Sequence, residues 1–434
     1  MIVRLIPVAL GVLILCAHFL RSGGSAQILA CLCAFALIFF KKRWFKTVAP
    51  FLLIAAALIW ADTAYELIFI RRIMGAPWMK MAIILGAVSL FTAASGMAFL
   101  SKKSKLFFDR NPETGNASAA AFLIVAMLLT IIQLKVNRPM LLLERFWPGG
   151  GWLEILALST YSAWIVEKMA DVKASAVWRK RIWLLFSVVF FTQLILGLFV
   201  SETFLMSGKM HIPVPAVILA GPIFRGDGFF MPVLFLSTMI IVGPAWCSHL
   251  CYMGAWDQLA SDRKKRPGAL PRWSTHLRVV VLAVVIGAAL ALKALGVSTT
   301  VAAVAALGFG VLGVLLMILV SRKLGTMFHC VVFCPIGLIA NVLGKISPFR
   351  LRFSDGCDGC GACGPSCRFG ALEKSHIEQR KVGLSCTLCG DCVGKCKTNQ
   401  LVYSFGKFRT PAIRLIFLAI VVSLHAVCLG IARI

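Results

Sequence analysis

The sequence predicts an α-helical polytopic membrane protein with about eleven spans and a small, cysteine-rich α+β domain inserted before the last span. Three observations indicate this fold class: 60% of the 434 residues are hydrophobic, only 14% are charged, and the apolar residues form long runs. A soluble fold of this length could not bury so much apolar surface, whereas lipid solvates it directly. The chain is therefore expected to lie mostly within a membrane.

The apolar runs define the candidate spans, because a helix that crosses a membrane needs about 20 mainly apolar residues. They are residues 5–20, 26–40, 48–68, 80–100, 119–135, 150–168, 182–201, 229–247, 276–296, 300–320 and 411–432. The first run is interpreted as a membrane helix, because no small-residue cleavage site of a signal peptide follows it. The predicted domains are N-terminal membrane helices over 1–181, a membrane core over 182–348, the inserted domain over 349–408 and a C-terminal membrane helix over 409–434.

Basic clusters between the apolar runs indicate an orientation. The formal net charge is +28, but these clusters suit membrane loops, so we expect contact with lipid and no nucleic-acid partner. A cytosolic N-terminus places five of them in the cytosol: Lys41-Lys42-Arg43, Lys102-Lys103-Ser104-Lys105, Arg179-Lys180-Arg181, Arg263-Lys264-Lys265-Arg266 and Arg322-Lys323. This follows the positive-inside rule, although the pair Arg71-Arg72 falls outside. We therefore expect a multi-pass protein of a bacterial inner membrane, with a cytosolic inserted domain and an external C-terminus.

The inserted domain contains the strongest motif of the chain. Its eight cysteines form two runs of the pattern C-x2-C-x2-C-x3-C, namely Cys357, Cys360, Cys363 and Cys367, then Cys386, Cys389, Cys392 and Cys396. This is the spacing of bacterial ferredoxins with two 4Fe-4S clusters, in which the fourth cysteine of each run ligates the other cluster. The predicted ligands are Cys357, Cys360, Cys363 and Cys396 for the first cluster, and Cys386, Cys389, Cys392 and Cys367 for the second.

Paired C-x2-C motifs also occur in zinc sites, which is the alternative for these cysteines. The pattern departs from ferredoxins at one point, because Arg368 and Lys397 stand where Pro normally follows the fourth cysteine. A cation beside a cluster stabilises its reduced form, so Arg368→Pro and Lys397→Pro are expected to lower the midpoint potentials in a potentiometric titration. The alternative is that both side chains simply reach water or lipid phosphate.

A second repeat carries four further cysteines. Cys247 and Cys251 follow the eighth candidate span, Cys330 and Cys334 follow the tenth, and each pair has the spacing C-x3-C. Pro335 after Cys334 indicates the start of a helix, where free backbone N–H groups favour a thiolate. Together the four thiols could hold a third iron–sulfur centre at the membrane surface. The alternatives are redox-active dithiols or ordinary packing residues.

These motifs resemble the NapH/NosR-type membrane polyferredoxins, which combine membrane spans, C-x3-C-P motifs and a double-cluster ferredoxin domain. The resemblance covers residues 182–408 and does not extend to the first six spans. Tyr252 replaces the expected Pro after Cys251, so one motif is incomplete. The resemblance implies electron transfer between a quinol pool or cytosolic donor and a periplasmic redox partner. No flavin-binding domain precedes the spans, so a periplasmic flavoprotein partner would be a separate chain.

We therefore predict a membrane-bound iron–sulfur electron-transfer protein that acts as a subunit of a respiratory system and holds two 4Fe-4S clusters. A third iron–sulfur centre and quinone are further candidate cofactors. The protein could act as the quinol dehydrogenase component of a respiratory system. One alternative is a redox accessory factor that matures or regulates a respiratory metalloenzyme. Another is a transporter whose clusters sense redox state, which would require broken helices with paired polar residues at mid-membrane.

Weaker candidates lie elsewhere in the chain. Asp62 and Glu66 share one helical face and could handle protons or quinone, although partial exposure at the end of the span explains them as well. A bis-His haem on His18 and His425, and a quinol contact at His211, are less supported than packing or surface roles. Four cysteines in apolar runs are most simply explained as small apolar fillers: Cys16, Cys31, Cys33 and Cys428.

Overall fold

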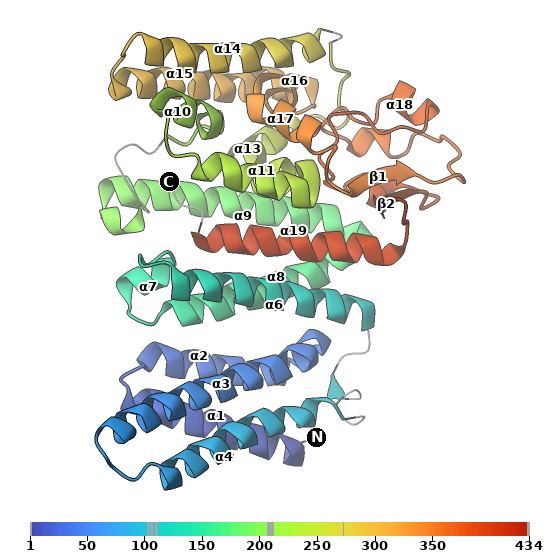
Figure 1. Cartoon of the computed structure of the whole chain (residues 1–434). Helices are drawn as coiled ribbons and strands as arrows, with labels where there is room; N and C mark the ends of the chain where they lie inside the picture. Colours follow the sequence, from blue (N-terminus) through green and yellow to red (C-terminus); the bar gives the residue numbers. More distant parts are fainter. Residues whose placement is uncertain are drawn as a thin grey trace. The chain divides into compact units, whose positions relative to one another are not determined.

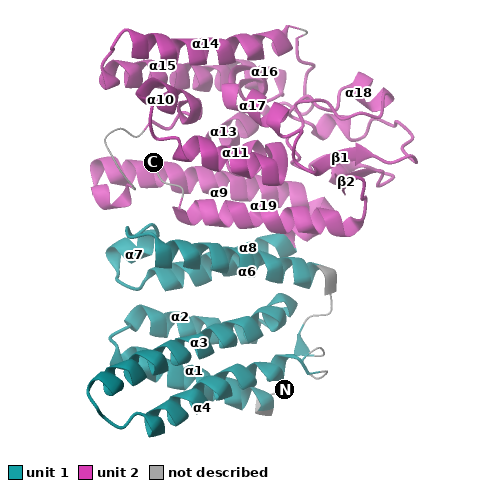
Figure 2. Ribbon diagram, viewed as in Figure 1, with its two compact units in different colours: residues 1–167 teal, residues 168–434 magenta. Residues whose placement is uncertain are grey.

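The structure is a computed structural model and describes residues 2–101, 104, 107–108, 112–205, 212–271 and 273–431. Lys102, Lys103 and Lys105 of one predicted basic loop, and the candidate His211, lie outside the described residues. The chain divides into two compact units, Met1–Glu167 and Lys168–Ile434, which Figure 2 colours separately. The cysteine motifs all belong to the second unit.

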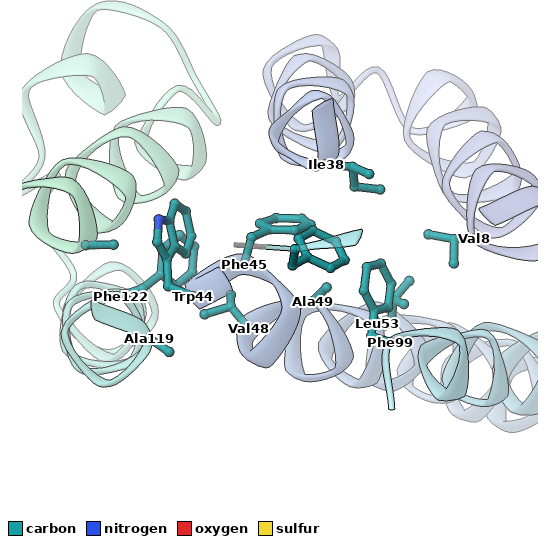
Figure 3. Close-up of a cluster of buried hydrophobic side chains, with 12 residues drawn as sticks. Val8, Ile38, Trp44, Phe45, Val48, Ala49, Leu53, Phe99, Ala119 and Phe122 are labelled. Carbon is teal, nitrogen blue, oxygen red and sulfur yellow. The ribbon is translucent and has the colours of Figure 1, made fainter. Parts of the chain in front are cut away.

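The first unit is a set of helices without a cysteine motif (Figure 1). Its helices are α1 (Ile2–Arg21), α2 (Ser25–Ala36), α3 (Arg43–Ile73), α4 (Met79–Ser95), α6 (Pro112–Lys135), α7 (Leu142–Phe146) and α8 (Gly151–Ala170). Aromatic side chains of α3 form its core, where Trp44 stacks on Phe122 at a centroid distance of 5.4 Å (Figure 3). Phe45 packs edge-on against Phe99 in the same cluster. Tight aromatic packing of this kind gives the unit a core of its own.

The second unit combines membrane-type helices with a small sheet domain. Its helices are α9 (Val172–Phe199), α10 (Val217–Arg225), α11 (Phe230–Val242), α12 (Trp246–His249), α13 (Tyr252–Ser261), α14 (Ser274–Ala294), α15 (Thr299–Leu316), α16 (Arg322–Leu324), α17 (Pro335–Leu343), α18 (Lys374–Glu378) and α19 (Pro411–Ile431). Two π-helical turns interrupt it, at Met317–Ser321 and His329–Phe333. Such turns are rare and often occur at functional sites.

Within the described residues, nine helices are long and apolar enough to cross a membrane, compared with the eleven spans predicted. The predicted span 26–40 instead forms a 12-residue α-helix that tightens into a 3-10 turn at Leu37–Phe40. The predicted span 150–168 is present as α8, but Glu154, Glu167 and Lys168 make it more polar than the other nine. Average hydropathy shows neither difference. The span at 26–40 differs by a change of helix type, and the span at 150–168 differs by a few charged residues.

One predicted boundary falls inside a helix. The cluster Arg179-Lys180-Arg181 was expected in a loop, with a domain boundary at 181/182, whereas α9 already begins at Val172. Asp171 caps this helix, because its carboxylate accepts a hydrogen bond from the N–H of Lys173 at 3.0 Å. An N-cap aspartate is a strong helix start. The basic cluster therefore lies on the first turns of α9, and the compact units divide earlier, after Glu167.

The inserted domain lies at one end of the helices of the second unit (Figure 1). Its sheet has two antiparallel strands, β1 (Phe349–Phe353) and β2 (Leu401–Phe405), paired with Leu351 opposite Tyr403. The sheet holds the second cysteine run, because the Tyr403 hydroxyl donates to the Leu388 carbonyl at 2.8 Å. Phe349 and Tyr403 also pack against Phe417 of α19. The domain is therefore fixed to the helix that follows it.

Candidate iron–sulfur centres

The two cysteine runs of the inserted domain repeat each other in backbone conformation. Three matched pairs of residues have positive φ: Gly359 (71°) and Leu388 (54°), Gly361 (74°) and Gly390 (77°), and Gly370 (66°) and Asn399 (56°). Left-handed residues turn backbone N–H groups into concave sites for anions. Ala371 and Gln400, each four residues after a fourth cysteine, donate their N–H groups to Cys367 Sγ and Cys396 Sγ, both at 3.3 Å. The sequence repeat is therefore a repeat of one anion-binding backbone.

The structure groups the eight thiols in the two crossed sets. The Cys363 thiol interacts electrostatically with those of Cys357, Cys360 and Cys396. A pocket is lined by the other four cysteines: Cys367, Cys386, Cys389 and Cys392. In the described part of the chain, no three His, Cys, Asp or Glu side chains converge as ligands of a single metal ion would. The fourth cysteine of each run thus lies with the first three of the other run, the arrangement that a two-cluster ferredoxin requires.

The two sets differ in exposure. Cys360 of the first set is exposed, and hydrogen bonds from Thr398 and from backbone N–H groups outweigh burial and lower the pKa of Cys396. In the second set, burial raises the pKa of Cys386 to about 12, and burial followed by repulsion from neighbouring thiols raises that of Cys392 well above its ordinary value. A buried thiol with such a raised pKa loses its proton when a metal ion such as iron binds to the sulfur. Both sets fit a cluster, and only the first set has an exposed thiol, that of Cys360.

The four cysteines of the C-x3-C pairs meet at one pocket. Cys247, Cys251, Cys330 and Cys334 all line it, together with Pro215 from the segment before α10. Cys251 is the N-cap residue of α13, with φ −74° and ψ 115°, and Cys334 is the N-cap residue of α17, with φ −76° and ψ 117°. Pro335 is the first residue of its helix, as the sequence indicated. The two C-x3-C pairs lie far apart in the sequence, yet each ends in an N-cap cysteine with the same backbone conformation.

Helix N-termini point at both N-cap thiols. Cys251 accepts hydrogen bonds from the N–H groups of Gly254 and Met253, and Cys334 accepts them from Gly337 and Ile336. Burial nevertheless raises the pKa of Cys251 to about 12. Two helix ends and four thiols around a pocket suit an anionic metal–sulfur group, because the helix dipoles stabilise negative charge.

Two polar side chains with an unpaired buried atom line this pocket. In the described part of the second unit, buried side-chain atoms without a hydrogen-bond partner belong to six residues: His249, Asp257, Arg278, His329, Asn341 and Thr387. Asn341 and Thr387 line the pocket itself, and His249 and His329 stand beside its cysteines in the sequence. The Asp257 carboxylate accepts from the Cys330 N–H at 2.9 Å. Buried polar groups are normally paired, so this concentration fits a bound group that the four cysteines would hold.

The pocket of the C-x3-C pairs and the pocket of the second cysteine set share two lining residues. Phe369 and Thr387 line both of them. The Ser248 hydroxyl, between Cys247 and Cys251, donates to the Thr387 carbonyl at 3.0 Å, between Cys386 and Cys389. Helix α12 of the membrane core and the second cysteine run are therefore in direct contact between the two sites.

A buried ion pair fixes this contact. Arg179 of α9 donates to Asp391 through Nε at 2.8 Å and through a terminal nitrogen at 2.7 Å, and it also donates to the Ser248 carbonyl. The exposed fractions of the two side chains are 0% and 7%. Asp391 lies between Cys389 and Cys392. The pair thus connects the second cysteine run to the segment that carries Cys247 and Cys251.

Arg368 has partners within the protein. Its guanidinium pairs with Asp262 at 3.3 Å and donates to the Gly325 carbonyl at 2.8 Å. Its charge is therefore compensated by a carboxylate. Arg368 therefore ties the domain to the loops before α14 and after α16, and we expect its effect on a cluster potential to be small. Lys397 is exposed and remains as predicted from the sequence.

Sequence reasoning missed Arg179, Asp391, Asp257 and Arg278. The sequence contains features that point to two of these four residues. Asp391 lies inside a cysteine run, and Arg278 is a basic residue near the start of an apolar run, where ionisable side chains are costly and often functional. The partners of Arg179 and Asp257 follow only from the fold.

The weaker candidates remain without a shared site. Asp62 and Glu66 are exposed on α3. His18 packs on Trp60 within the first unit, and His425 Nδ1 is 3.1 Å from the His249 carbonyl within the second. These contacts correspond to packing roles for both histidines.

Comparison with known proteins bears on these sites. The model of a 4Fe-4S binding domain matches residues 224–269 and 304–354, and each matched segment contains one C-x3-C pair. The protein named "Putative electron transport protein YccM" of Escherichia coli is 25% identical over 225 residues, covering 46% of this chain and 62% of the relative. These matches support a resemblance of the chain to the 4Fe-4S membrane polyferredoxin family.

A second relative is "Uncharacterized protein MJ0749" of Methanocaldococcus jannaschii, which is 24% identical over 183 residues. That match covers 40% of this chain and 69% of the relative. The chain spans less than two thirds of the length of YccM. No solved structure matches the chain.

Proposed function

We propose that this protein transfers electrons along three iron–sulfur centres, from a soluble donor at the inserted domain to the membrane surface. The match to a 4Fe-4S binding domain and the similarity to a putative electron transport protein support iron–sulfur electron transfer. The observation that carries the proposal is the pair of shared lining residues, Phe369 and Thr387, between the pocket of the second cysteine set and the pocket of the C-x3-C pairs. Iron–sulfur clusters supply reversible one-electron chemistry when bound.

The order of the centres follows from one exposed ligand. Cys360 is exposed, so the first centre, on Cys357, Cys360, Cys363 and Cys396, would receive electrons from a cytosolic donor. The second centre, on Cys367, Cys386, Cys389 and Cys392, has no exposed ligand, and its pocket adjoins that of the third. The third would be a 4Fe-4S cluster on Cys247, Cys251, Cys330 and Cys334.

The membrane side of the route is proposed from the sequence. A quinone pool or a separate periplasmic redox protein or flavoprotein would exchange electrons with the third centre. The basic clusters support an inner membrane location with the inserted domain in the cytosol. Arg179, Asp391 and Ser248 hold the inserted domain against the membrane core, so the second and third centres keep a fixed separation.

Replacement of Cys330 by Ala tests the third centre. We expect the variant to lose about four of about twelve iron atoms per chain and to retain both ferredoxin signals in low-temperature EPR. The wild-type protein should be purified anaerobically, and Cys428→Ala is the matched control, because this cysteine lies in α19 away from the pocket. An unchanged iron content in the Cys330 variant would reject a cluster there. Zinc in place of iron would reject the whole function.

A further inference from the structure

Arg278 is a buried cation that has no carboxylate partner. It lies on α14, its exposed fraction is 6%, and its Nε and one terminal nitrogen have no hydrogen-bond partner. None of the ion pairs formed by the described residues includes it. A guanidinium stays charged in proteins, and an uncompensated buried charge is very costly. The side chain therefore needs an anion that the protein atoms do not provide.

The surroundings of Arg278 identify where this anion would be. Helix α14 packs against α17 and against the turn His329–Phe333, the elements that carry Cys334 and Cys330. The neighbouring Leu277 packs in the same apolar cluster as Cys330. The guanidinium is close enough to the thiols of Cys247 and Cys334 to interact with them electrostatically.

We propose that Arg278 is the counter-cation of the group held by Cys247, Cys251, Cys330 and Cys334, and that it raises the reduction potential of that group. The inference rests on the proposed third centre. Four thiolates around an iron–sulfur core carry a net negative charge, which increases on reduction. A fixed positive charge in a site of low dielectric constant stabilises the more negative form most strongly.

The two buried arginines near the centres differ in whether a carboxylate compensates their charge. The charge of Arg179 is compensated by Asp391, whereas that of Arg278 is available to the four cysteines. The buried carboxylate of Asp257, which contacts the Cys330 N–H, acts in the opposite sense when ionised. Because Arg278 cannot lose its proton, it favours the third centre as the acceptor of electrons from the second.

The test is a potentiometric EPR titration of the full chain, purified anaerobically, with iron counted per chain. We expect Arg278→Gln to lower the reduced-to-oxidised ratio of the third centre about tenfold at a fixed ambient potential, equivalent to about 59 mV for one electron. Arg278→Lys should remain near the wild-type ratio. Lys293→Gln, which removes the same charge from the far end of α14, should leave the ratio unchanged. The ferredoxin signals report folding in each sample, and Arg278→Met provides a second neutral variant.

The outcomes separate this inference from the proposed function. A third centre with an unchanged ratio in both neutral variants would overturn the role of Arg278 and leave the centre intact. A wild-type protein with about eight iron atoms and no third signal would overturn both. Loss of the third centre in the neutral variants but not in Arg278→Lys would support the charge requirement. Loss in the Lys variant as well would assign the guanidinium to the fold and reject the inference.

Discussion

Replacement of Cys367 by Ala is expected to remove the second iron–sulfur centre, although Cys367 belongs to the first cysteine run. Its thiol lines the same pocket as those of Cys386, Cys389 and Cys392, and the N–H of Ala371 points at its sulfur. A cluster that loses one of four thiolate ligands is destabilised and opened to solvent. We expect about four iron atoms per chain to be lost, with the first centre retained.

The matched variant is Cys396→Ala, at the equivalent position of the second run. It should remove the first centre and retain the second. EPR spectra of the two variants, each reduced with dithionite, distinguish the centres if their signals differ in redox titration or in relaxation. If each variant instead lost the centre of its own run, the crossed ligation would be wrong.

The same two variants also test the order in which electrons pass through the three centres. The second centre adjoins the third through Phe369 and Thr387, so its loss should prevent a soluble donor from reducing the third centre. Loss of the first centre should slow entry from that donor without disconnecting the second from the third. Stopped-flow reduction of each variant by a soluble donor measures both effects. Equal reduction of the third centre in wild type and Cys367→Ala would contradict the proposed order.

Part of the cysteine arrangement can be predicted from the sequence because it is encoded locally. The spacing of each run determines which three thiols lie together, and the positive-φ residues follow it at matched positions. The helix start at Pro335 is likewise a short-range feature. Local patterns therefore predict the grouping within each run and the helix start at Pro335, whereas the complete ligand sets combine distant residues and stay a prediction.

Features that depend on tertiary contacts were not predictable in this way. Arg179 and Asp391 are 212 residues apart, and no spacing rule connects a cation on a helix with a carboxylate in a cysteine loop. Arg179 was assigned to a basic loop because charge alone does not distinguish a loop from the first turns of α9. The break of the second predicted span at Leu37 is a change from α-helix to 3-10 helix that hydropathy does not register.

Replacement of Arg179 by Gln is expected to destabilise the docking of the inserted domain by about 3–5 kcal/mol, because it leaves the Asp391 carboxylate buried without its cation. Arg179 makes four hydrogen bonds, to both Asp391 oxygens, the Ser248 carbonyl and the Gln258 side chain. It also lies over the Trp183 ring, at 5.1 Å from its centroid. Protease cleavage between Cys367 and Cys386, followed over time in detergent, measures the loss of docking.

The control is Arg181→Gln, which removes an equal charge from an exposed position two residues along the same helix. This variant should stay near wild type, because exposed charges contribute little to stability. The double variant Arg179→Met with Asp391→Leu should recover much of the lost stability, since it removes both buried charges together. Suppose that stability recovers while the contact between Ser248 and the second cysteine run becomes weaker. The ion pair would then position the inserted domain more than it stabilises its docking. A single Arg179 variant as resistant to protease as wild type would mean that other contacts, among them those of Phe417 and Arg368, hold the domain in place.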